Sequence, residues 1–135
     1  MTSLIIDGSN VVRSAYGLQG TPNFALEAEL SDKLVNYLSG LNTDASRSIE
    51  CYFDGFKRSI YRPSGLCVFF SARHKADKLI VNSIYEHTRH YAHDVLVITD
   101  DNEIIRAARA CGAQVQYTYD FLKGFGPYLA YKEQL

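Results

Sequence analysis

The sequence predicts an α/β protein whose mostly parallel β-sheet is covered by helices on both faces. Two observations support this prediction. Short apolar segments of strand length alternate with segments whose apolar residues recur at helical spacing, which is typical of parallel sheets. Acidic residues also stand directly after several of the strand-like segments. The 135 residues contain no linker or low-complexity tract, so we expect one domain over residues 1–135.

The chain is predicted to begin with a strand, a loop and a helix. Residues 3–7 form a predicted buried strand, because an apolar run over 4–6 ends in an aspartate. A polar loop that contains glycine and proline is expected from about residue 8 to residue 23. Residues 24–42 predict a helix, because their leucines have helical spacing and a glycine and an asparagine mark the end. These leucines are Leu26, Leu30, Leu34, Leu38 and Leu41.

Two further strands are predicted in the middle of the chain. The segment SIECYFDG alternates apolar residues at Ile49, Cys51 and Phe53 before it ends in Asp54 and Gly55. A basic connection, FKRSIYRPSG, follows it, with a turn expected at PSG. The next segment, LCVFFS, is apolar throughout and is predicted to be the third strand.

The second half of the chain continues the alternation of helix and strand. A second amphipathic helix is predicted by ADKLIVNSIYEHTRHY, with Leu79, Ile80, Ile84 and Tyr91 expected to face inward. The fourth strand is predicted by DVLVITDD, a helix ending at Gly112 by NEIIRAARACG, and the fifth strand by AQVQYTY. From about residue 120 the tail is unusually aromatic. It is expected either to pack on the core or to form a partner or dimer surface.

The net charge and the spacing of the cysteines and histidines argue against several classes of protein. The net charge of -1, from 14 basic and 15 acidic residues, is not that of an obvious nucleic-acid binder, although the distribution of charge matters more than its sum. Neither a signal peptide nor a membrane span is expected. Three widely spaced cysteines argue against a disulfide framework, and they predict reduced, mostly buried thiols in a cytoplasmic protein. A zinc site at His87, His90 and His93 is disfavoured, because the helix is expected to end near Tyr91.

Carboxylates are predicted to meet at one edge of the sheet. Asp7, Asp54 and the adjacent Asp100 and Asp101 end strands, and Asp77 opens a helix. In a parallel sheet these positions share the carboxyl edge, where such folds bind ligands. Converging carboxylates repel one another unless a cation neutralises them, and oxygen donors without a cysteine or histidine cluster favour Mg²⁺ or Mn²⁺. The alternative for each acid is a capping role in a turn or helix.

Four motifs resemble those of a known family. LIIDGSN resembles the first motif of NYN domains, especially the YacP-like ribonucleases within the PIN-like nuclease superfamily. The segments YFDG, KADKLI and VLVITDDNEIIRAARACGAQV follow in the family's order, so the resemblance covers about residues 3–118. It implies a three-layer α/β/α PIN-like sandwich with a five-stranded sheet in the order 3-2-1-4-5. It also implies divalent-metal-dependent endoribonuclease activity.

The resemblance also implies roles for individual residues. Asp7, Asp54, Asp77 and Asp101 match the family's metal-binding acids, and Asn10 accompanies the first of them. Asp100 stays an alternative to Asp101, because only one of two adjacent strand residues is expected to face a site. Thr99 is expected to orient Asp101 or the scissile phosphate, or to hydrogen-bond a local amide.

In one respect this sequence departs from the family pattern. Many members carry a second acid on the helix that Asp77 begins, whereas Val81, Asn82 and Ser83 stand at the nearby positions here and the next acid is Glu86. One tightly bound metal, or slow catalysis, is the expected consequence.

Basic residues are expected to bind RNA phosphates near the same edge. Tyr16, Phe56 and Tyr61 stand close to these basic residues in the sequence, and they are candidates for stacking on unpaired bases. The alternative is a solvated loop surface whose aromatic residues fold onto the core. The predicted phosphate-binding residues are Arg13, Lys57, Arg58, Arg62, Arg73 and Lys75.

The hypothesis is therefore an endoribonuclease that cleaves single-stranded RNA with a metal-activated water. Ribosome-associated mRNA is one expected substrate. The alternative is an RNA- or ribosome-binding module with a relict nuclease site. A phosphohydrolase of the haloacid dehalogenase type is disfavoured, because Ser9 stands where that class carries a second aspartate. A nucleotide-binding fold is disfavoured too, since the chain has neither a GxGxxG nor a GK[ST] loop.

Overall fold

The computed structural model describes residues 2–19, 24–41, 47–55, 57, 66–91 and 93–134. None of the helices in these ranges is long and apolar enough to cross a membrane. In chain order the elements are β1 (Thr2–Asp7), α1 (Gly8–Gln19), α2 (Phe24–Leu41), β2 (Arg47–Phe53), β3 (Leu66–Phe70), α3 (Asp77–Tyr85), the π-helical turn η1 (Glu86–His90), β4 (Asp94–Ile98), α4 (Asn102–Ala110), β5 (Gln114–Gln116) and α5 (Thr118–Gln134).

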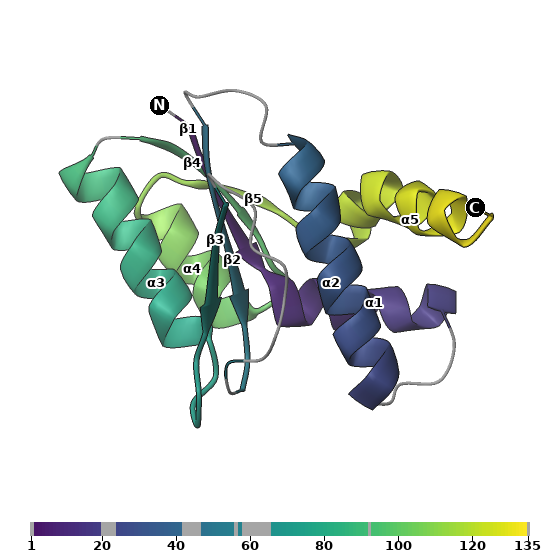
Figure 1. Cartoon of the computed structure of the whole chain (residues 1–135). Coiled ribbons are helices and arrows are strands. Elements are labelled where there is room, and N and C mark those ends of the chain that lie inside the picture. The colour runs from purple at the N-terminus through teal and green to yellow at the C-terminus, as the bar shows by residue number, and fades with distance from the viewer. Residues whose placement is uncertain are drawn as a thin grey trace.

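The sheet confirms the predicted order and direction. Its strands run in the order β3-β2-β1-β4-β5, and all neighbouring strands pair in parallel. Helices α1, α2 and α5 cover one face, and α3 and α4 cover the other (Figure 1). Because β1 is central and every strand points the same way, the residues that follow β1, β2 and β4 meet at one edge.

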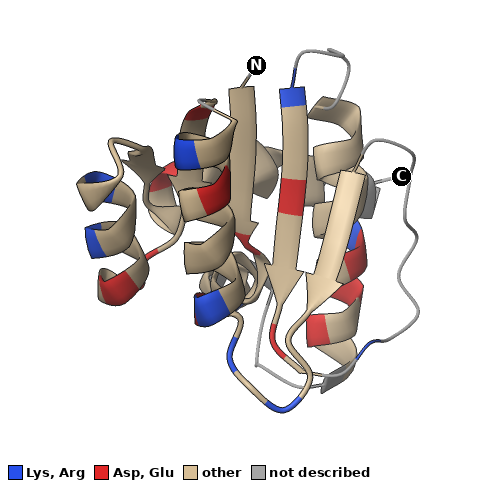
Figure 2. Ribbon diagram, turned by 90° about the vertical axis from the view of Figure 1, so that its left-hand side faces the viewer, with Lys and Arg blue, Asp and Glu red and all other residues tan. Residues whose placement is uncertain are grey.

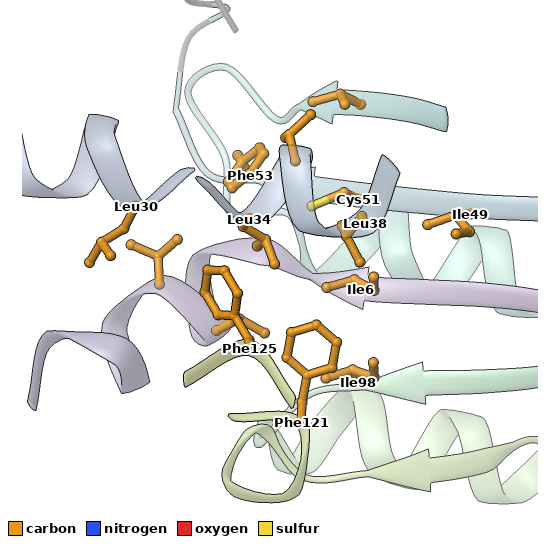
Figure 3. Packing of buried hydrophobic residues seen from close by; sticks show 14 of the residues in the cluster. Ile6, Leu30, Leu34, Leu38, Ile49, Cys51, Phe53, Ile98, Phe121 and Phe125 are labelled. Atoms are coloured by element: carbon orange, nitrogen blue, oxygen red, sulfur yellow. The ribbon is translucent and has the colours of Figure 1, made fainter. Parts of the chain in front are cut away.

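A separate hydrophobic cluster fills the space on each side of the sheet. Ile6 on β1 packs in the cluster beneath α1, α2 and α5, together with Leu34 and Phe125 (Figure 3). Its neighbour Ile5 packs in the cluster beneath α3 and α4, with Ile80 and other residues. Adjacent residues of β1 are thus buried on opposite faces, which holds the strand in register up to Asp7.

The loop expected over residues 8–23 is wrong for residues 8–19, because α1 begins directly after β1 and occupies them. Val11, Val12 and Ala15 are fully buried on its inner face, at helical spacing. Gly8 makes the abrupt start possible. A Cβ there would lie 2.8 Å from the Sγ of Cys51 and 2.8 Å from the carbonyl oxygen of Tyr52. The glycines and proline of this segment hid the short apolar pattern.

The aromatic tail is helical and packs on the core. The predicted fifth strand is only three residues long, and α5 starts at Thr118. Phe121, Phe125 and Leu129 are buried against α1 and α2, which agrees with the first of the two expectations. Tyr119, by contrast, is 75% exposed.

The inward face predicted for the second amphipathic helix is partly wrong. Ile80 and Ile84 are buried as expected, but Leu79 and Tyr91 are exposed, and His87 is buried in their place. His87 continues the regular repeat, because it is three residues after Ile84. The π-helical turn then adds a residue to the repeat and rotates Tyr91, which follows it, off the buried face.

The structure also shows where the three histidines lie and how far the three cysteines are buried. His87 and His93 approach each other, with 3.1 Å between their Nδ1 atoms, whereas His90 is exposed. The three histidines therefore do not share a face. Of the three cysteines, Cys51 is buried, Cys67 is exposed and Cys111 is half-buried, so the expectation of mostly buried thiols is wrong.

Candidate functional site

A pocket of about 230 Å³ lies at the carboxyl edge of the sheet. Acidic and basic segments gather where the strands end (Figure 2). A larger cavity of about 570 Å³ lies at the opposite edge. Among the described residues that line it, Asp94 alone is acidic, so it offers no group of carboxylates. We therefore place the candidate site in the smaller pocket. Its lining residues are Asp7, Asn10, Arg13, Asp54, Lys75, Asp77, Asp100 and Asp101.

Asp7 is the most buried acid of the site, with 5% of its surface exposed. Its Oδ2 accepts hydrogen bonds from Asn10 Nδ2 and from Thr99 Oγ1, each at 2.9 Å. Burial raises the pKa of the Asp7 carboxyl, the hydrogen bonds from Asn10 and Thr99 oppose this effect, and the charge of Asp54 adds to it. A cation beside Asp7 would offset the free-energy cost of keeping this carboxylate charged.

A second group of acids lies at the starts of α3 and α4; Asp77 and Asp101 of this group line the pocket, and Glu103 is exposed beside them. Single carboxylate oxygens of Asp77, Asp101 and Glu103 all lie within 4.8 Å of one another. Burial raises the pKa of Asp77, and the charges of Asp101 and Asp54 raise it further. Such oxygen donors, in the absence of a nearby thiolate or imidazole among the described residues, suit a hard ion such as Mg²⁺ or Mn²⁺.

Glu103 is a candidate ligand that the sequence reasoning missed. It lies in the first turn of α4, where an acidic residue is ordinarily explained by the helix dipole. Its spacing gave no signal, because side chains two residues apart on a helix do not ordinarily face each other, and the closeness to Asp101 appears only in the structure.

Asp100 and Asp101 have different partners. The two oxygens of Asp100 accept hydrogen bonds from the N–H of Thr118 at 2.9 Å and from its Oγ1 at 2.5 Å. Asp101 uses one oxygen, Oδ1, to accept the N–H groups of Glu103 and Ile104 at the start of α4. Both acids line the pocket because both lie beyond the end of β4, where strand alternation no longer applies.

Asp54 lies in the same pocket with both carboxylate oxygens in hydrogen bonds. Its Oδ2 is 2.6 Å from Nη2 of Arg13, and its Oδ1 accepts the N–H of Ala76 at 2.8 Å. Its own N–H donates to Ser9 Oγ at 2.8 Å. The structure thus links the end of β2 to α1 and to the residue that precedes α3.

The structure brings some of the predicted RNA-binding residues to the pocket and leaves others apart. Arg13 and Lys75 line it, while Lys57 and Arg73 are exposed but do not line it. Tyr16 is half-buried against the core, and its hydroxyl donates to Glu27, which favours the packing role over stacking. Outside the described residues lie Arg58, Arg62, Phe56 and Tyr61.

Known proteins resemble the chain in sequence and in fold. The family profile described as a YacP-like NYN domain matches residues 4–125. The crystal structure of Rae1 (YacP) from Bacillus subtilis superposes with a TM-score of 0.73 at 19% identity, covering 99% of this chain and 79% of that chain. A mutant of the same protein gives a TM-score of 0.72 at 20% identity, covering 99% of this chain and 80% of the other. No curated protein matches the chain.

Proposed function

The chain belongs to the YacP-like NYN domain family, and from that premise we propose that it is a divalent-metal-dependent endoribonuclease. The observation that carries the proposal is the convergence of buried Asp7 with Asp77 and Asp101 in one pocket that also contains basic side chains. Carboxylates hold the ion in this proposal, and cations hold the phosphodiester.

The acids of the pocket fit a Mg²⁺ or Mn²⁺ ion. We assign Asp7, Asp77 and Asp101 as ligands, with Glu103 added because its carboxylate lies beside the last two. Bound there, the ion would supply activation of water for in-line attack on the phosphodiester and charge stabilisation of the leaving oxygen. Asn10 and Thr99 hold the Asp7 carboxylate in place through their hydrogen bonds.

RNA is the proposed substrate, bound through its phosphates as a single strand. Arg13 and Lys75 are in position to contact the phosphates nearest the acids. The exposed Lys57 and Arg73 are proposed to add phosphate contacts without reading the sequence. Arg58 and Arg62, outside the described residues, stay candidates from the sequence alone. The family resemblance suggests products with 5′-phosphate and 3′-hydroxyl ends, and it suggests ribosome-associated mRNA in the cytoplasm as the substrate in cells.

One experiment tests the substrate class and the product ends together. A 3′-labelled single-stranded RNA with a 5′-hydroxyl end, and the same strand in a duplex, are incubated with the protein and Mn²⁺. We expect faster cleavage of the single strand, and fragments that a 5′-phosphate-dependent exonuclease degrades. Products that resist this exonuclease lack a 5′-phosphate and would contradict the proposed product ends. Equal cleavage of the duplex would contradict the single-strand preference.

The alternative is an RNA- or ribosome-binding module with a relict nuclease site. Two observations favour it. Both carboxylate oxygens of Asp54 already have protein partners, and positions 81–83 of α3 carry no acid. RNA binding that persists in EDTA, with no cleavage in Mg²⁺ or Mn²⁺, would support this alternative.

A further inference from the structure

We propose that Asp54 is a positioning residue that holds Arg13 against an RNA phosphate, and that it is not a ligand of the metal ion. The inference rests on the proposed function, and it replaces the metal-binding role that the family resemblance implies for Asp54. The close contact between Asp54 Oδ2 and Arg13 Nη2, at 2.6 Å, is the observation that suggests it.

The Asp54 carboxylate is fixed from several sides. The backbone N–H of Ala76, just before α3, donates to its second oxygen at 2.8 Å, and Ser9 on α1 accepts the N–H of Asp54 itself at 2.8 Å. The residues beyond β2 and β3 are also joined, because the N–H of Ala72 donates to the carbonyl of Gly55 at 2.7 Å. A carboxylate held in this way can orient a flexible partner.

Arg13 is well placed to use that orientation. It follows Asn10 by three residues on α1, so both side chains lie on the same side of the helix and both line the pocket. An arginine has five N–H donors in a planar fork, which suits bidentate contact with a phosphate. Its ion pair with Asp54 is made through Nη2, and 58% of the side chain is exposed to solvent.

The energetics favour an orienting role over a stabilising one. Exposed ion pairs typically contribute little to folding stability. A free arginine side chain, however, loses considerable rotamer entropy when it is immobilised. The Asp54 contact immobilises Arg13 before RNA binds, so less of this entropy is lost on binding.

Replacing Asp54 separates the two roles by the sign of the effect. Removing a negative charge beside a phosphate site should by simple electrostatics strengthen RNA binding. If Asp54 orients Arg13, the Asp54→Asn variant should instead bind RNA more weakly. If Asp54 were a metal ligand, the variant should lose Mn²⁺ affinity.

The test compares Asp54→Asn, Arg13→Gln and the double variant with the wild type. Mn²⁺ affinity is measured by titration calorimetry without RNA, and KM and kcat are measured with a single-stranded RNA. We expect Mn²⁺ affinity of Asp54→Asn within about twofold of wild type, and KM raised about tenfold in each single variant with kcat within about threefold. The double variant should be no worse than Arg13→Gln, because the two residues act through one contact.

Two controls guard against misfolding and general charge effects. Glu29→Gln breaks a comparable surface pair with Lys33 on α2, away from the pocket, and should leave KM unchanged. Arg13→Lys keeps the charge but loses the fork, and should recover only part of the affinity. Melting temperatures within a few degrees of wild type verify folding.

Several outcomes would overturn the inference. Loss of Mn²⁺ binding in Asp54→Asn, tighter RNA binding, or additive effects in the double variant would each do so. If the wild type cleaves no RNA, the proposed nuclease function fails. RNA affinity, measured by fluorescence anisotropy in the same variants, then still decides whether Asp54 positions Arg13, and a wild type that binds no RNA would refute both.

Discussion

Replacing Asp7 by asparagine should leave the fold intact while removing most of the stabilisation that Mn²⁺ gives. The side chain is buried, and burial together with the Asp54 charge raises its pKa above the ordinary value of 3.8. A carboxyl whose pKa is raised by folding destabilises the folded state at pH values above that pKa. Without metal, Asp7→Asn should therefore be at least as stable as wild type at pH 7. This advantage should shrink as the pH falls through the raised pKa.

The size of the metal effect follows from linkage and from the length of the chain. An ion at 100 times its dissociation constant stabilises the folded state by about 2.7 kcal/mol. For 135 residues the entropy of unfolding is about 0.28 kcal/mol per kelvin, so Mn²⁺ should raise the wild-type melting temperature by about 10 °C. If Asp7→Asn weakens binding about 100-fold, the same Mn²⁺ concentration gives about 0.4 kcal/mol, or about 1–2 °C.

Differential scanning fluorimetry of both proteins, with EDTA and with Mn²⁺, measures these shifts. Asp32→Asn is the matched control, because Asp32 is an exposed acid on α2, and it should show the wild-type shift. The reasoning is refuted if Asp7→Asn shows the full Mn²⁺ shift. It is also refuted if the metal-free variant is less stable than wild type by more than about 1 kcal/mol, which is about 3–4 °C here.

Three further predictions concern the surroundings of the site. Gly8→Ala should destabilise the fold by about 2 kcal/mol or more, because the added Cβ meets the carbonyl of Tyr52 at 2.8 Å. Gly40→Ala, with nothing within 4 Å, should not destabilise it in the same thermal melts. Burial alone would raise the pKa of Glu50, but hydrogen bonds from Ser83, His87 and Tyr52 outweigh burial and lower it below its ordinary value of 4.5. Glu50 should therefore contribute stability that is lost as the pH falls below 4.5. Denaturant unfolding at pH 3–7 should show this loss in wild type and a flatter profile in Glu50→Gln. Glu103→Gln should weaken Mn²⁺ binding about tenfold, since ligand charge sets the affinity of such sites; unchanged affinity in calorimetry would remove Glu103 from the ligand set.

The sheet and most of its acids could be predicted from sequence because both follow from short-range patterns. An apolar run that ends in aspartate and glycine identified β1 and Asp7, and the same reasoning located Asp54 and Asp101. The parallel arrangement then placed these residues at one edge without any knowledge of side-chain contacts.

What could not be predicted depends on contacts between distant segments or on small changes of helical phase. The ion pair of Arg13 with Asp54 joins residues 41 apart, and it required knowing that residues 8–19 form a helix. The π-helical turn moved Tyr91 off the buried face, although Tyr91 is seven residues after the buried Ile84, and no regular repeat indicates that change. The sequence favoured Asp101 but left Asp100 as an alternative, and the contact that separates them, Thr118 on both oxygens of Asp100, joins residues 18 apart.

The central claim is that the acids around Asp7 hold an ion that drives RNA cleavage. It is tested most directly by incubating a mixed pool of single-stranded and structured RNAs with Mn²⁺, Mg²⁺ or EDTA, using wild type and Asp7→Asn side by side. The account predicts cleavage by wild type in Mn²⁺ or Mg²⁺, none in EDTA and none by the variant under any condition. Cleavage by Asp7→Asn at the wild-type rate, or cleavage that persists in EDTA, would contradict it.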